Sequence, residues 1–162
     1  MDPISIGTAA TGLIHICANL TGRLFTFLSR ARTVDESIQT LRFEIESLSQ
    51  SLISLRSSFD DPLIAEAIVN TQARHERQHW QNVRQSLVHC SRILTRFEEM
   101  LENVESCEGH FLINVRRQIR MDMRSREMVL FKEQITSCRR TLHLSLQLIT
   151  VYSSQDYHVL TG

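Results

Sequence analysis

Three long stretches of the chain repeat apolar residues at alternating spacings of three and four, and this pattern constrains the fold more than any other feature. The repeat places its apolar residues along one side of an α-helix, because a helix turns once in about 3.6 residues. Only two prolines and five glycines are present to interrupt long helices. The first seam contains Val34, Ile38, Leu41, Ile45, Leu48, Leu52, Leu55 and Phe59; the second Trp80, Val83, Leu87, Cys90, Leu94, Phe97, Leu101 and Val104; and the third Met128, Phe131, Ile135, Cys138, Leu142, Ile149 and Tyr152, interrupted only by Ser145.

Capping and helix-breaking residues mark the ends of these helices. Thr33 and Glu36 form a capping box, Pro62 stops the helix that follows, and Gly109 closes the next one. We expect a short connecting turn or helix over 63–69, and no segment has the pattern of a strand. The sequence therefore predicts an all-α protein, an antiparallel bundle of four to five helices with an apolar N-terminal helix.

A chain of 162 residues suits one domain with one core. We expect this helical bundle over 1–153, with 1–32 as the N-terminal helix, 33–153 as the heptad-patterned helices and 154–162 as a linker stub. Lys plus Arg and Asp plus Glu are both 18, and this balance argues against a nucleic-acid partner. Lys132 is the only lysine among the basic residues, and the others are arginines. The guanidinium of arginine can donate two hydrogen bonds to one phosphate or carboxylate, so these groups are possible partners.

The four cysteines, Cys17, Cys90, Cys107 and Cys138, have neither CxxC nor zinc-finger spacing. Three of them occupy positions where the helical pattern requires an apolar residue, which is typical of reduced core cysteines in a cytosolic protein. A signal peptide is not expected, because Asp2 stands in place of a basic start and polar residues interrupt 3–22.

The first predicted helix, from Pro3 to about Arg32, differs from the others because it has no charge before Arg23. Its two faces are an apolar stripe and a neighbouring stripe of small or polar residues, where a helix exposed in a soluble bundle normally carries charge. The apolar stripe contains Ile6, Ala10, Leu13, Cys17, Leu20, Leu24 and Phe27, and is widened by Ile4, Ile14, Ile16, Phe25 and Leu28. The other contains Ser5, Thr8, Gly12, His15, Asn19, Gly22 and Thr26.

Two interpretations of this helix stay open. In the first, it is hidden at the centre of the bundle, where small residues let neighbouring helices approach closely. In the second, it is exposed conditionally, inserting its apolar residues into a membrane. Residues 4–28 would span roughly 37 Å at about 1.5 Å per residue, which is sufficient for a bilayer core of ~30 Å. Small residues four apart favour close packing in lipid, and His15 with Asn19 could line the interior of an oligomer.

His75, Glu76 and His79 match the HExxH pattern of zinc peptidases, in which one helix face carries two imidazole ligands and a general base. The context disagrees, because Asn82 and Gln85 occupy positions where one peptidase class has Gly and a third ligand. A di-iron bundle would need a second ExxH, which the sequence lacks. We therefore expect the polar start of a helix, with no catalytic residue, no metal site and no cofactor.

The densest basic run of the chain lies between the second and third seams. It is either a solvated surface or a contact for anionic lipid headgroups, where each basic residue near the membrane contributes about 1 kcal/mol. The run contains Arg116, Arg117, Arg120, Arg124 and Arg126.

Both ends of the chain resemble one family. Residues 1–7 (MDPISIG) with the small-residue helix, and residues 131–135 (FKEQI) and 139–148 (RRTLHLSLQL), are similar to the opening and closing helices of the HeLo-like N-terminal domain of fungal STAND (NOD-like) receptors and cell-death effectors. The likeness covers nearly the whole chain, in which start, finish, length and order agree.

The resemblance implies a cell-death execution domain, cytoplasmic when latent and at the plasma membrane when active. In this family the N-terminal helix is released on activation, forms a homo-oligomer and permeabilises the membrane. The partners implied are anionic membrane lipids and a NOD-like receptor or amyloid-signalling protein. The alternative is a non-lytic helical module that recruits similar domains of an immune-type receptor.

Overall fold

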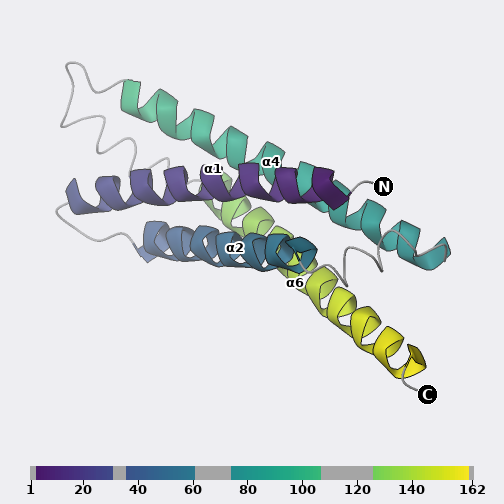
Figure 1. The fold of residues 1–162 in the computed structure, drawn as a ribbon. Coiled ribbons are helices and arrows are strands. Elements are labelled where there is room, and N and C mark those ends of the chain that lie inside the picture. Colours follow the sequence, from purple (N-terminus) through teal and green to yellow (C-terminus); the bar gives the residue numbers. More distant parts are fainter. Residues whose placement is uncertain (1–2, 31–35, 61–73, 107–125, 161–162) are drawn as a thin grey trace.

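The computed structural model describes residues 3–30, 36–60, 74–106 and 126–160, and this part of the chain consists of four α-helices without a strand (Figure 1). Helix α1 spans Pro3–Arg30, α2 spans Glu36–Asp60, α4 spans Arg74–Ser106 and α6 spans Arg126–Leu160. The all-α prediction is confirmed. The short element expected over 63–69 lies outside the described residues, as do Thr33, Pro62 and Gly109, the residues expected to bound the helices.

The end of α6 differs from expectation. We expected a linker stub over 154–162, but the helix continues through Leu160. The physical reason is visible in the sequence, since no glycine or proline occurs between Ser145 and Gly162 to interrupt the helix.

Each described helix runs in the opposite direction to the previous one, as the colour gradient in Figure 1 shows. Helix α1 packs mainly on α2 and α4, and α6 packs mainly on the same two helices. Helices α1 and α6 therefore occupy opposite sides of the bundle, and α1 and α4 are parallel neighbours. Through interfaces that do not involve α1, α6 contacts both α2 and α4.

The core follows the predicted seams. The described members of the seam in α2, from Ile38 to Leu55, are buried, and so are those in α4 from Val83 to Leu101. Phe59 and Trp80, at the end of α2 and near the start of α4, are partly buried, with ring centroids 5.4 Å apart. Each buried Leu, Ile or Phe side chain contributes about 1.5–3 kcal/mol to folding, so these seams dominate the stability of the bundle.

Ser145 interrupts the third seam and is nevertheless buried. Its hydroxyl donates a hydrogen bond to the carbonyl oxygen of Thr141, one turn earlier, at 2.9 Å. A serine can occupy this position because its helix satisfies the hydroxyl locally, so the seam continues through a polar residue.

Three of the four cysteines, Cys17, Cys90 and Cys138, are buried free thiols on α1, α4 and α6. The prediction that helical apolar positions hold core cysteines is confirmed for these three. Cys107 lies outside the described residues.

Candidate functional surface on the first helix

The inner side of α1 matches the predicted apolar stripe. Ile6, Ala10, Leu13, Cys17, Leu20 and Leu24 are buried in the common core. The flanking Ile14, Ile16 and Leu28 are partly buried against it, whereas Phe25 is 59% exposed. The side chains of Ile4 and Phe27 lie outside the described part of the chain. In this structure, most of the residues expected to insert into a membrane are therefore buried in the core or packed against it.

The outer side of α1 is exposed and uncharged. All seven residues of the small and polar stripe are exposed, among them Gly12, His15, Asn19 and Gly22. The interpretation that this face is hidden at the centre of the bundle is therefore wrong for the chain considered alone. The reason is architectural: a helix packed mainly on two neighbours buries only the side that faces them, and α1 meets mainly α2 and α4.

Local hydrogen bonds reduce the polarity of this face. Thr26 Oγ1 donates to the carbonyl oxygen of Gly22 at 3.0 Å, and Thr11 Oγ1 donates to that of Gly7 at 2.9 Å. A hydroxyl that donates a hydrogen bond within its own helix keeps that bond when it leaves water. The free-energy cost of removing water from it is therefore small. The face is thus easier to transfer into a protein or lipid environment than its composition suggests.

The glycines of the exposed face border open space. A Cβ atom added at Gly12 or Gly22 would meet no atom within 4 Å outside the adjacent backbone. Neither glycine is therefore required for packing in the described bundle, although a glycine within a helix costs about 1 kcal/mol relative to alanine.

Two polar contacts join α1 to α4. Asn19 Nδ2 donates to Glu98 Oε1 at 2.5 Å, and one turn later Arg23 Nη1 lies 3.6 Å from Glu102 Oε1. The two members on each helix are four residues apart, so both contacts lie on the same side of the α1–α4 interface. We call Asn19, Arg23, Glu98 and Glu102 the α1–α4 latch.

A cation–π contact joins α1 to α2. The guanidinium carbon of Arg42 lies 5.8 Å from the centroid of the Phe25 ring, and Arg42 Nε lies 3.4 Å from Glu46 Oε1. The carboxylate and the exposed ring thus hold the cation between them. Contacts of this kind at exposed sites contribute about 0.5–1 kcal/mol.

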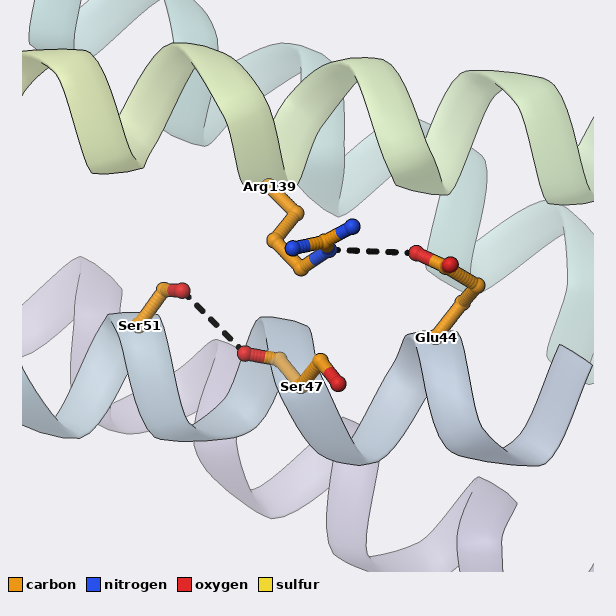
Figure 2. Close-up of polar contacts among 4 residues, drawn as sticks. All are labelled: Glu44, Ser47, Ser51 and Arg139. Atoms are coloured by element: carbon orange, nitrogen blue, oxygen red, sulfur yellow. Dashed lines mark hydrogen bonds and ion pairs between the residues drawn. The ribbon is translucent and has the colours of Figure 1, made fainter. Parts of the chain in front are cut away.

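The remaining three helices are also joined by contacts that do not use α1. Arg139 Nε donates to Glu44 Oε2 at 3.1 Å, which joins α6 to α2 (Figure 2). Ser51 Oγ donates to the carbonyl oxygen of Ser47 in the same region of α2. Helices α4 and α6 are joined by the rings of Phe97 and Phe131, whose centroids are 5.2 Å apart. Departure of α1 would leave these interactions in place.

Several residues singled out in the sequence cannot be placed. Of the arginine run, Arg116, Arg117, Arg120 and Arg124 lie outside the described residues, and Arg126 is the first residue of α6, with its side chain outside the described part. The HExxH residues His75, Glu76 and His79 begin α4, and their side chains are likewise outside it. Among the side chains that are described, no group of three His, Cys, Asp or Glu residues could hold a metal ion.

An apolar stripe on α6 was missed at the sequence level. Leu144, Leu148 and Val151 are 60%, 42% and 49% exposed, and their spacing of four and three places them on one face. From this leucine-rich segment, the third predicted seam contained Leu142. In the structure, Leu142 is buried and Leu146 is partly buried. Leu144 lies between the buried Leu142 and Ser145 along the chain, so the exposed stripe occupies the side of α6 that faces away from the core.

Length and hydropathy give different results for membrane spanning. Helix α1 has 28 residues, which meets the expected length of a span. Within the described ranges, however, no helix is both long and apolar enough to cross a membrane. The small and polar face of α1 lowers its mean hydropathy.

No protein-family model, curated protein or solved structure matches this sequence.

Proposed function

We propose that this chain is a latent membrane-permeabilising domain of the HeLo-like type, whose first helix is the effector. The observation that carries the proposal is the composition of α1: a buried apolar stripe lies opposite an exposed face without charge. A helix whose only task is to pack in a bundle normally has charged residues on its outer face, because charge there favours solubility. An uncharged outer face is an advantage to a helix that leaves water.

In the proposed mechanism, α1 separates from α2 and α4 and its buried stripe turns towards lipid. The stripe residues Leu13, Leu20 and Leu24 then exchange a protein core for hydrocarbon, which is a small change of environment. Helices α2, α4 and α6 stay associated through interfaces such as the Glu44–Arg139 ion pair. The energetic cost of release is mainly the exposure of the core surface that α1 covers.

The limited hydropathy of α1 favours insertion as an oligomer over insertion as a single helix. Several copies can turn their small and polar faces towards one another, so that His15 and Asn19 face the interior while the apolar stripe faces lipid. Gly12 and Gly22 let the backbones approach closely, as small residues do in membrane helix pairs. The polar atoms that prevent a lone helix from crossing would then line the assembly.

The sequence supports an anionic membrane as the target. The run of Arg116, Arg117, Arg120, Arg124 and Arg126 would contact lipid headgroups. The domain would be cytoplasmic when latent and at the plasma membrane when active. Activation would come from a NOD-like receptor or an amyloid-signalling partner. No cofactor and no enzymatic step enter this proposal.

A non-lytic interaction module is the second candidate function, and the exposed stripe of α6 favours it. Leu144, Leu148 and Val151 are exposed on one helix face, of the kind that docks against another helix. In this interpretation the uncharged face of α1 would also contact a protein and never enter lipid.

The first test compares the full chain with a deletion of residues 1–30 in a dye-release assay on vesicles that contain phosphatidylserine. We expect the full chain to release dye on activation, and the truncated chain to remain helical, unfold cooperatively and release none. Equal leakage from both chains would refute the effector role of α1. A truncated chain that cannot fold would favour a structural role for this helix.

The second test uses the exposed glycines. The double substitution Gly12→Leu and Gly22→Leu should preserve the resting fold, because both sites border open space, and should abolish leakage by preventing close helix packing. Gln81→Leu with Gln85→Leu is the matched control, since both residues are exposed on α4. Leakage of the glycine variant at the level of the control would contradict oligomerisation through this face.

A further inference from the structure

Helices α4 and α6 are antiparallel, and an aromatic pair defines how they align. The rings of Phe97 on α4 and Phe131 on α6 are 5.2 Å apart. One heptad earlier in α4 is Cys90, and one heptad later in α6 is Cys138. Because antiparallel helices advance in opposite directions, the register that pairs the two phenylalanines also pairs the two cysteines.

The two thiols meet in the core as this register requires. Cys90 is 1% exposed and Cys138 is 4% exposed, and each thiol is the largest influence on the pKa of the other. The two residues come from different helices and from sequence positions far apart. They are therefore a facing pair across the α4–α6 interface.

Helix geometry brings such a pair within reach of a covalent bond. Packed helices have axes about 8–10 Å apart, and Cα atoms lie about 2.3 Å from each axis, so directly facing Cα atoms are about 3.4–5.4 Å apart. Disulfides join Cα atoms about 4.4–6.8 Å apart. A small change in the side-chain torsion angles is therefore sufficient to bring the two sulfur atoms within bonding distance.

We propose that Cys90 and Cys138 are a redox modification site, which a hydroperoxide converts to an intramolecular disulfide that joins α4 to α6. This inference is independent of the proposed function. With hydrogen peroxide, a thiolate attacks the peroxide oxygen, which forms a sulfenic acid and releases hydroxide that takes up the proton left by ionisation of the thiol. The second thiol attacks that sulfur, the S–S bond forms and a second water leaves. The two thiols lose two electrons, and one peroxide is reduced to two waters.

The neighbouring thiol and burial raise the pKa of Cys90, whereas Cys90 lowers the pKa of Cys138. Either thiol can act as the attacking thiolate once local opening exposes the pair. Burial raises the pKa of Cys17 to about 12, so that thiol remains protonated. Because the pair is buried, the oxidant reaches it through local opening of the bundle, and the reaction should be slow.

The test treats the full chain with hydrogen peroxide and maps its peptides without reduction by mass spectrometry. We expect one linked peptide pair that contains Cys90 and Cys138 with the loss of two hydrogen atoms. The melting temperature should rise by about 10 °C, because the bond closes the long loop over 91–137, and dithiothreitol should reverse the rise.

Cysteine variants show which thiols form the disulfide. Cys138→Ala should form no disulfide and show no reversible rise in melting temperature, whereas Cys107→Ser should behave as the unsubstituted chain does. If Cys138→Ala does not fold, Cys138→Val provides a second variant that fills the site. Linkage through Cys17 or Cys107, or oxidation of Cys90 and Cys138 to sulfinic acids without linkage, would overturn the proposal.

Discussion

The α1–α4 latch provides a direct test of latency, because two of its residues can be removed without changing α1. Glu98 accepts a hydrogen bond from Asn19, and Glu102 forms an ion pair with Arg23. Glu98→Ala with Glu102→Ala removes both contacts and leaves the sequence of the proposed effector helix intact. We expect this double variant to release α1 more readily and to permeabilise membranes at lower protein concentration.

The magnitude follows from the exposure of the contacts. The Glu102 side chain is 64% exposed, so its ion pair contributes about 0.2–1 kcal/mol. The hydrogen bond of Asn19 to Glu98 is also exposed and contributes about 0.5–1.5 kcal/mol. Together the two contacts contribute about 0.7–2.5 kcal/mol. Their loss should raise the population with α1 released by about 3–60-fold, because 1.4 kcal/mol corresponds to a factor of about ten.

Two measurements report the change. Hydrogen exchange should become faster by that factor in α1 amides and remain nearly constant in the core of α2 and α6. Dye release from phosphatidylserine vesicles should rise in parallel. The control is Glu99→Ala with Glu133→Ala, which removes the same charge from exposed positions of α4 and α6. This control separates release of α1 from the general attraction of a more basic protein to an anionic surface.

The reasoning would be refuted by a latch variant whose α1 exchanges no faster than that of the control. Faster exchange without a rise in leakage would preserve the latch and exclude α1 as the permeabilising element.

Three further predictions concern the core, the membrane contact and pH. Leu20→Asp places an unpaired charge at a fully buried site and should destabilise the bundle by about 3–5 kcal/mol in urea unfolding, whereas Ala18→Asp, at an exposed site, should have little effect. Replacing four bases of the arginine run with Gln should weaken binding to anionic vesicles in flotation assays and flatten its salt dependence; binding that does not change at low salt would identify the run as a solvated surface. Those four are Arg116, Arg117, Arg120 and Arg124. Because burial raises the pKa of Cys17 from 9.0 to about 12, the folded state holds this proton more tightly than the unfolded state. The protonated thiol therefore contributes fully to the free energy of unfolding below pH 9.0. About 4 kcal/mol of this free energy is lost as the pH rises towards 12. Cys17→Ala should flatten this fall in urea titrations, and a fall of equal slope in both proteins would contradict it.

The sequence by itself determined the helices and their inward faces. Spacings of three and four leave one side of a helix apolar whatever its neighbours are, so the burial of residues such as Leu48, Phe97 and Ile135 followed from periodicity alone. The same argument identified the apolar stripe of α1 and placed three cysteines in the core. A linker stub was expected over 154–162, but α6 continues through Leu160, because no glycine or proline there breaks the helix.

Which helix covers which face depends on tertiary packing. Periodicity defines the faces of a helix but does not say how many neighbours it has, so the exposure of Gly12 and Asn19 depended on α1 packing mainly on two helices. The separation of Leu142 in the core from Leu144 at the surface depended on which side of α6 faces α2 and α4. The pairing of Cys90 with Cys138 depended on the register between two antiparallel helices, because contacts between distant parts of a chain are fixed by packing that no local pattern contains.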